Sequence, residues 1–193
     1  AAPVTIAIYY GMQSMFEGET HVLTPGGAYT DWTEVAKAST FTKQEHPLFR
    51  RYVEKNRQGY QSTWLLPDGL GDHALLDGQD DIFIYAPYGK SYHKLIGNKR
   101  MENGDKTCWR GVYTWFETPI ADDADLLCYE GSVGGHTAVF IDCKRACKRT
   151  LALPGYLDLR HFGTAEQNSG IRISAAGRNK LKIKAGAPGS CVL

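Results

Sequence analysis

Cys108, His136 and Asp142 combine the three side-chain types that nucleophilic catalysis by a thiol requires. A cysteine becomes a nucleophile when a neighbouring base removes its proton, and the base needs a polar group that holds its ring in place. His136 opens the segment HTAVFID, which Asp142 closes. These residues support the hypothesis of a secreted cysteine hydrolase or acyltransferase, with Cys108 as nucleophile, His136 as base and Asp142 as the orienting group.

A Cys108-Trp109 pair with a later histidine that opens a strand is similar to the arrangement in papain-like and transglutaminase-like hydrolases. The resemblance implies a nucleophile at Cys108 and a base at His136. In those folds a helix begins at the cysteine, because the helix N-terminus lowers the pKa of the thiol. Residues 107–116 (TCWRGVYTWF) predict a strand instead. The favoured alternative therefore places Cys108 in a disulfide and His136 at a strand edge.

The residues WRGV at 109–112 look like the aromatic-Arg-Gly strand that binds NAD in ADP-ribosyltransferases. This resemblance implies an ADP-ribosyltransferase-like toxin, with Arg110 at the NAD site. The family also has a Ser-Thr-Ser-type strand and a Glu-x-Glu or Gln-x-Glu pair, and neither follows Arg110. An ion pair between Arg110 and an acid such as Asp122 or Glu130 is the favoured alternative.

Two segments have side chains that bind metals in other proteins. The loop 68–81 holds five carboxylates, but it lacks the alternating Asp positions and the final Glu of an EF-hand, so a solvated acidic loop is favoured. Three residues separate Cys143 from Cys147, rather than the two of the close Cys-x-x-Cys pair of zinc sites, and cationic residues surround them. The sequence therefore predicts neither a metal nor a cofactor.

The C-terminal part of the chain is basic although the whole chain has a net charge of only +1. Residues 143–193 contain ten Lys and Arg against Asp158 and Glu166, which gives +8 for this part and −7 for the rest. The basic residues that alternation should bring to one face of a hairpin are Arg172, Lys180, Lys182 and Lys184. The favoured interpretation of this face is a solvated surface that serves solubility, and the alternative is a binding surface for nucleic acid, acidic polysaccharide or anionic lipid. Few aromatic residues accompany it, so nucleic acid is a less favoured partner.

All five cysteines lie in the second half of the chain, at Cys108, Cys128, Cys143, Cys147 and Cys191. The chain also begins with Ala1 rather than Met, as it would after removal of a signal peptide. Together these features predict a secreted protein with two disulfides and one unpaired thiol, in which Cys191 is paired. The alternative is a cytosolic protein whose cysteines are reduced and buried.

The pattern of elements predicts an α+β fold over a single domain, 1–193. Two short helices are expected in the N-terminal third: one starts at Asp31 with Glu34 in a capping-box position, and one runs from Pro47 to Gly59. The remainder predicts a mainly antiparallel sheet with a disulfide-stapled C-terminal half. The expected strands are 4–10, 62–66, 82–86, 107–116, 126–130 and 137–142, followed by a hairpin of 171–175 with 181–183.

These patterns favour a secreted binding protein of toxin or effector type over an enzyme. Its expected partner is an extracellular or host macromolecule or surface, which the basic end suggests is anionic. No stretch approaches the roughly 20 apolar residues that a membrane-spanning helix needs. The cysteine hydrolase or acyltransferase is the alternative, and the ADP-ribosyltransferase-like toxin is less favoured.

Overall fold

A computed structural model of the 193-residue chain describes the backbone of residues 4–13, 19–23, 27–31, 41–45, 51–67, 81–85, 92–101, 104, 109–163, 166–167 and 170–193. Side-chain burial is described for residues 19–23, 27–31, 53–62, 64, 104, 112–163 and 170–193. The chain divides into two compact units, of which the first is Ala1–Leu23 with Tyr29–Tyr113 and the second is Thr24–Ala28 with Thr114–Leu193. The single-domain interpretation stays a prediction.

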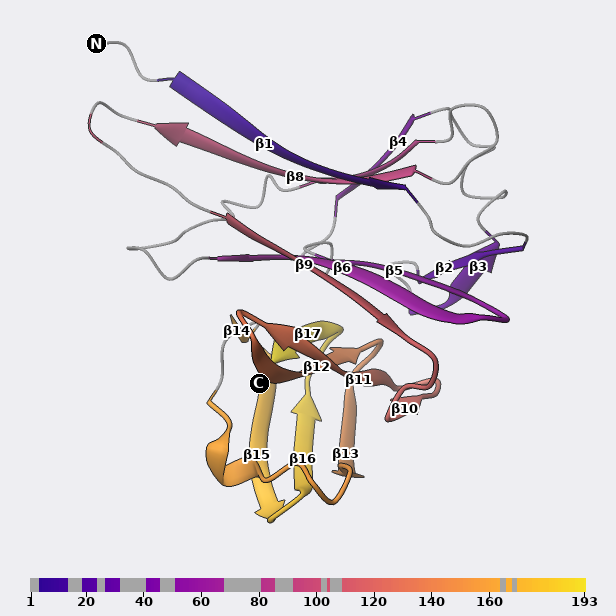
Figure 1. The fold of residues 1–193 in the computed structure, drawn as a ribbon, viewed down its shortest axis with the longest axis vertical. Helices are drawn as coiled ribbons and strands as arrows, with labels where there is room; N and C mark the ends of the chain where they lie inside the picture. Colours follow the sequence, from indigo (N-terminus) through magenta and orange to yellow (C-terminus); the bar gives the residue numbers. More distant parts are fainter. Residues whose placement is uncertain are drawn as a thin grey trace. The chain divides into compact units, whose positions relative to one another are not determined.

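The strands of the first unit form two sheets, ordered β1-β8-β7-β4 and β3-β2-β5-β6-β9 (Figure 1). Neighbouring strands run antiparallel, as in the ladders β1–β8 and β5–β6. Strand β9 ends this unit, because the boundary between the units falls within it. The strands are β1 (Val4–Gln13), β2 (His21–Leu23), β3 (Tyr29–Asp31), β4 (Phe41–Glu45), β5 (Arg51–Asn56), β6 (Gly59–Pro67), β7 (Asp81–Tyr85), β8 (Tyr92–Met101) and β9 (Trp109–Phe116).

The second unit also contains two sheets, ordered β10-β11-β12-β17-β14 and β13-β16-β15. The chain passes from the first of these sheets to the second through the short turn between β12 and β13. Its elements are β10 (Ala121–Asp122), β11 (Leu126–Val133), β12 (His136–Cys143), β13 (Cys147–Ala152), the 3-10 turn η2 (Leu159–His161), β14 (Glu166–Gln167), β15 (Ile171–Gly177), β16 (Lys180–Ala185) and β17 (Gly189–Val192).

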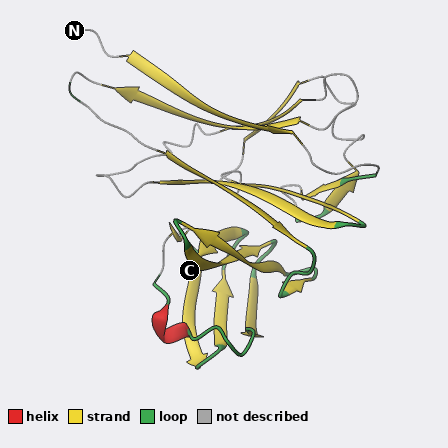
Figure 2. Ribbon diagram, viewed as in Figure 1, coloured by secondary structure: helices red, strands yellow, loops and turns green. Residues whose placement is uncertain are grey.

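The predicted α+β fold is wrong, because neither of its two helices is found among the described residues, which are nearly all in antiparallel strands. Strands make up 62% of the chain, and the described residues contain no α-helix (Figure 2). Asp31, the expected start of a helix, is the last residue of β3, and residues 32–40 lie outside the described part. The expected helix from Pro47 to Gly59 coincides instead with β5 and the start of β6.

Local hydrogen bonding explains why β5 and β6 form a hairpin. The side-chain oxygen of Asn56 accepts a hydrogen bond of 2.7 Å from the Gln58 amide, which closes the turn after β5. Gly59 adopts a φ of +136° and pairs with Asn56 at the first position of β6. Gly59, which was expected to end a helix, is therefore the first residue of a strand. A glycine with a positive φ is found both after helices and in the tight turns of hairpins.

The hydrophobic core of the second unit lies between its two sheets. Leu126, Val139 and Ile141 face it from the larger sheet, while Leu181 and Ile183 face it from the three-stranded sheet. All five side chains are at most 2% exposed. The two sheets therefore form a β-sandwich. Strand alternation separates inward apolar from outward polar residues in the three-stranded sheet, whereas Leu127, Tyr129 and Phe140 on the other side of β11 and β12 are also fully buried.

The predicted disulfides are absent among the cysteines that the structure describes. Cys128, Cys143, Cys147 and Cys191 form no disulfide, so the expected disulfide at Cys191 is also wrong; Cys108 lies outside the described residues. Cys128, Cys143 and Cys191 have no exposed surface and belong to the sandwich core. They pack there as small apolar side chains, which is the usual role of a free buried cysteine.

Thiol labelling should follow this burial. A mild alkylating reagent is expected to modify Cys147, which is half-buried, and to spare Cys128, Cys143 and Cys191 until the protein unfolds. Burial also raises the pKa of the Cys128 thiol to about 12, so little reactive thiolate is present there. Peptide mass spectrometry after timed labelling measures the order in which the cysteines are alkylated. Disulfide-linked peptides joining any of these four cysteines in a non-reduced digest would contradict the expected pattern.

Candidate functional site

The outward side of the three-stranded sheet β13-β16-β15 gathers five cations that we call the basic face. On β16, exposed Lys180, Lys182 and Lys184 alternate with buried Leu181, Ile183 and Ala185. The same alternation exposes Lys148 on β13 and Arg172 on β15. Because each strand turns every second side chain outward, the five cations share one surface, and the basic face consists of Lys148, Arg172, Lys180, Lys182 and Lys184.

The strand register places three of these cations in a row. Lys184 on β16 lies directly opposite Lys148 on β13 and opposite Arg172 on β15. Neighbouring strands are about 4.8 Å apart and alternate residues along a strand about 6.8 Å apart. The basic face therefore extends about 10 Å across the strands and about 14 Å along β16. Like charges directly opposite each other destabilise a sheet, so the row carries a cost in folding free energy.

The other five cations of residues 143–193 form ion pairs with four aspartates of the same unit. Arg149 spans Asp123 and Asp125 with two contacts of 2.8 Å. Each of the remaining four has an aspartate partner; the pairs are Lys144–Asp122, Arg145–Asp125, Arg160–Asp158 and Arg178–Asp158. No ion pair involves a cation of the basic face among the side chains that the structure describes. Five of the ten cations are therefore paired with aspartates. The other five form the basic face, where none of the described acids pairs with them.

The pKa values of the aspartates reflect this pairing. Hydrogen bonds from Arg149 and Arg145 hold the pKa of the Asp125 carboxyl below its usual value. Hydrogen bonds from Arg160, together with its charge, lower the pKa of Asp158. Both carboxylates therefore stay ionised at neutral pH and remain bound to their own cations, so they do not neutralise the basic face.

Of the residues that the sequence proposed for binding, the structure brings together Arg172, Lys180, Lys182 and Lys184. It adds Lys148, which the sequence analysis missed. The alternation of Lys148, Thr150 and Ala152 with Cys147, Arg149 and Leu151 was the available signal. That signal was weak, because Arg149 carries a charge on the inward side and hides the pattern.

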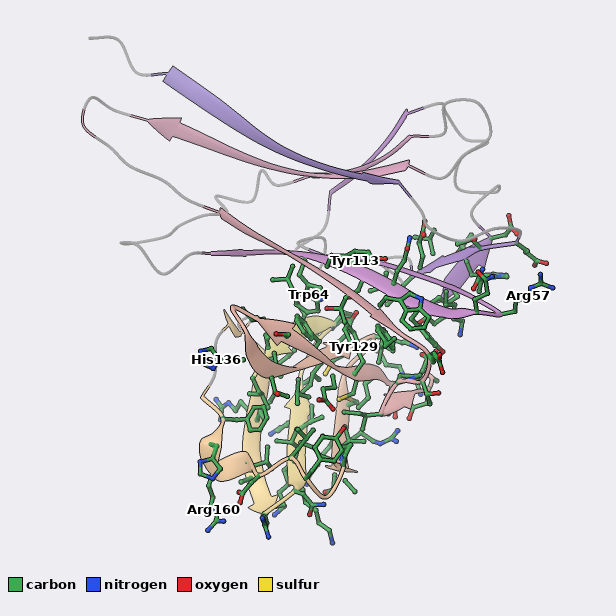
Figure 3. The ribbon with its side chains drawn as sticks, in the orientation of Figure 1. Arg57, Trp64, Tyr113, Tyr129, His136 and Arg160 are labelled. Atoms are coloured by element: carbon green, nitrogen blue, oxygen red, sulfur yellow. The ribbon has the colours of Figure 1, made fainter. Side chains whose placement is uncertain are left out.

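The three residues proposed for thiol catalysis are not brought together as a triad. His136 is exposed at the start of β12 (Figure 3), and Asp142 is fully buried near its end. The two residues are six positions apart along an extended strand, a separation of about 20 Å, which prevents Asp142 from orienting the imidazole. Cys108 lies outside the described residues. The Cys108–His136 pair stays a prediction.

The structure describes only part of the residues on which the remaining sequence hypotheses depend. Arg110 lies in strand β9, as the pattern predicted, but its side chain is outside the described part. Of the two acids expected to pair with it, Asp122 binds Lys144, and Glu130 accepts a hydrogen bond of 2.5 Å from the Tyr156 hydroxyl. The acidic loop falls outside the described residues up to position 80, and Asp81 begins β7.

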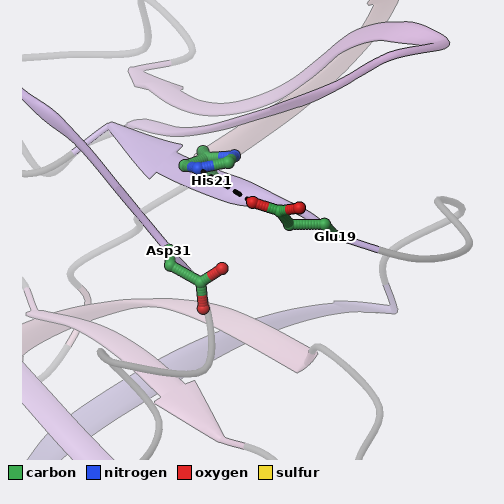
Figure 4. A group of neighbouring side chains, drawn as sticks. All are labelled: Glu19, His21 and Asp31. Carbon is green, nitrogen blue, oxygen red and sulfur yellow. Dashed lines mark ion pairs between the residues drawn. The ribbon is translucent and has the colours of Figure 1, made fainter.

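A second group with metal-ligating side chains lies in the first unit. Glu19, His21 and Asp31 each offer one ligand atom, and these atoms all lie within 4.8 Å of one another. The Nε2 atom of His21 is 3.6 Å from Oε1 of Glu19, and Asp31 lies on the strand beside them (Figure 4). The sequence analysis missed this group, because it placed Asp31 at the start of a helix.

No helix in the described part of the chain has the length and apolar composition that crossing a membrane requires. The basic face and the group of Glu19, His21 and Asp31 are two described features whose side chains could bind a ligand. Comparisons of the chain with protein-family models, with curated protein sequences and with solved structures found no match.

Proposed function

We propose that the protein is a secreted binding protein of toxin or effector type whose basic face binds an anionic polysaccharide. The observation that carries this proposal is the grouping of five cations on one sheet surface, with no acid at the outward positions of the three strands. Such a surface attracts polyanions through the release of their counterions. The secreted location and the toxin or effector role come from the sequence patterns and stay predictions.

The distribution of charge supports binding over mere solubility. A solubilising surface works best with both signs of charge interspersed. Here aspartates pair with the other cations of residues 143–193, while Lys148, Lys184 and Arg172 lie next to one another at a cost in stability. A polyanion laid across the row would replace that repulsion with attraction.

The uncharged residues of the surface favour a polysaccharide over single-stranded nucleic acid. The outward positions next to the cations include Thr150 and Ser174, whose hydroxyls can donate and accept hydrogen bonds with sugar hydroxyls. No aromatic residue occupies an outward position of β13, β15 or β16, so nothing there can stack on a base. The length of about 14 Å along β16 suits a chain with several charges rather than one small anion.

Heparin binding by charge-reversed variants tests the proposal. The variant Lys180→Glu/Lys182→Glu/Lys184→Glu should elute from immobilised heparin at much lower salt than the unmodified protein. Each lysine removed is expected to reduce the slope of log affinity against log salt concentration by about 1, since one counterion contact is lost per lysine. Titration calorimetry at several salt concentrations measures the slope.

The matched control is Arg57→Glu, which reverses one exposed cation in the turn between β5 and β6 of the first unit. It should leave the salt slope unchanged. Elution of the triple variant at the same salt as the unmodified protein would reject the basic face as the binding surface. Tighter binding to single-stranded DNA or to anionic lipid vesicles than to heparin would reject the polysaccharide.

A further inference from the structure

We propose that Glu19, His21 and Asp31 form a binding site for a divalent transition-metal ion, with Zn²⁺ as the reference ligand. The group belongs to the first unit, so it is independent of the basic face. Its donors are two carboxylates and one imidazole, a combination that suits Zn²⁺ and related ions rather than the all-oxygen preference of Ca²⁺ or Mg²⁺.

Strand pairing brings the three side chains to the same side of the sheet. His21 on β2 lies directly opposite Asp31 on β3, and residues opposite each other on paired strands project from the same face. Glu19 precedes His21 by two positions, which is the period that returns an extended chain to the same side. The arrangement therefore follows from the backbone and does not depend on one long flexible side chain.

The separation of the donor atoms fits chelation after a small adjustment. The three ligand atoms lie within 4.8 Å of one another. Two ligands that each lie about 2.1 Å from Zn²⁺ are at most about 4.2 Å apart. A side-chain movement of about 1 Å therefore suffices for binding, and no strand has to shift.

The exposure of the three side chains also suits a metal site with open positions. His21 and Asp31 are half-buried and Glu19 is exposed, so water can occupy the remaining coordination positions. Lys55 on β5 pairs with His21 on its other side. The Lys55 ammonium lies 3.8 Å from the centroid of the Tyr29 ring and makes a cation–π contact with it.

The thiols of the second unit are weaker candidates for the same ion. A cysteine must lose its proton to bind a metal. Burial raises the pKa of Cys128 to about 12 and also raises that of Cys143, which keeps both protonated at neutral pH. Among the described residues, Glu19, His21 and Asp31 are the only group of three ligand-type side chains close enough together to share an ion.

Titration of the full chain with Zn²⁺ tests the site. Calorimetry on the unmodified protein should show one saturable site, and His21→Ala should weaken its affinity tenfold or more. Asp31→Asn and Glu19→Gln should weaken it as well; Glu19→Gln alters an exposed residue outside the strands, so it tests the site even if a strand variant unfolds. The matched controls, His161→Ala and Glu117→Gln, remove an exposed imidazole and an exposed carboxylate elsewhere and should leave the affinity unchanged.

Co²⁺ in place of Zn²⁺ identifies the donors. The visible bands of the bound ion should appear without the near-ultraviolet charge-transfer band of a Co²⁺–thiolate bond. A thiolate band that persists in His21→Ala, no saturable binding by the unmodified protein, or equal affinity in the three ligand variants and the controls would each overturn the proposal.

Discussion

Replacing Lys144 by methionine is expected to reduce the free energy of unfolding by about 3–5 kcal/mol, because it leaves a buried carboxylate without its cation. The Lys144 side chain is only 4% exposed, and its ammonium lies 2.5 Å from Oδ1 of Asp122. It also donates a hydrogen bond of 2.7 Å to the backbone carbonyl of Asp123. Methionine keeps the volume of lysine but makes neither contact. Urea denaturation followed by far-ultraviolet circular dichroism measures the loss.

Two further variants separate charge from packing at this position. Arg145→Met removes the neighbouring cation, which is 63% exposed where it pairs with Asp125, and should cost less than about 1 kcal/mol. The double variant Lys144→Met/Asp122→Leu removes both buried charges and should recover most of the stability. A single Lys144→Met variant as stable as Arg145→Met would show that the buried pair is not a main support of the second unit.

Gly27 adds a second constraint around Lys144. The segment that contains it belongs to the second unit although it precedes the rest of that unit in sequence. A Cβ atom at Gly27 would lie 2.8 Å from the backbone carbonyl oxygen of Lys144, and its φ is +78°. Both facts require glycine, because a side chain would collide with a backbone atom that cannot turn away.

Replacing Ile183 by alanine is expected to cost about 2–5 kcal/mol of unfolding free energy. Ile183 is 1% exposed and lies in the sandwich core together with Leu181 and Ile141. Truncation removes apolar contacts and leaves a cavity that the surrounding strands can fill only in part. The same urea titration measures this change.

The matched control for Ile183→Ala is Lys182→Ala, one position earlier on the opposite side of β16. It should change the stability by no more than about 0.5 kcal/mol, because the lysine is exposed. Heparin affinity should show the reverse pattern: Lys182→Ala weakens it, and Ile183→Ala retains it below its melting temperature. Equal stability losses in the two variants would contradict the assignment of inward and outward sides.

The strands were predictable where an apolar period of two was clear. In Ile171–Gly177 and Lys180–Ala185 the alternation of Ile and Leu with Lys and Ser indicated both the strands and their outward faces. Residues 126–130 and 137–142 were identified from their β-branched and aromatic content. The residues proposed for binding on these strands were identified from the same alternation.

The N-terminal third was mispredicted because its local signals fit two structures. Asp31 with a glutamate three residues later fits a helix start, yet Asp31 pairs with His21 in a sheet. Tyr52 and Val53 fit the inner face of a helix as well as a strand that pairs with β6. Pairing with distant strands decides between the two, and a single sequence does not display those partners.

The disulfides were mispredicted because a cysteine count does not reveal where the sulfur atoms lie. Cys128 and Cys191 both lie opposite Ile141, on either side of β12, so a third strand separates them in the sheet. Cys143 occupies a core position of β12. The side chains that could bind a metal were missed for a similar reason, since only the pairing of β2 with β3 makes Asp31 a neighbour of His21.

On strand β16 the exposed lysines alternate with the buried core residues. This separation has a consequence for how the protein can evolve. Under the proposed function, substitutions at Lys180, Lys182 and Lys184 change the ligand preference, while Leu181 and Ile183 maintain the core. Selection can therefore retune the ligand preference one residue at a time without passing through unfolded intermediates. Insertion or deletion of a single residue within the strand would do the opposite, because it would turn the lysines into the interior and disrupt the core and the basic face together.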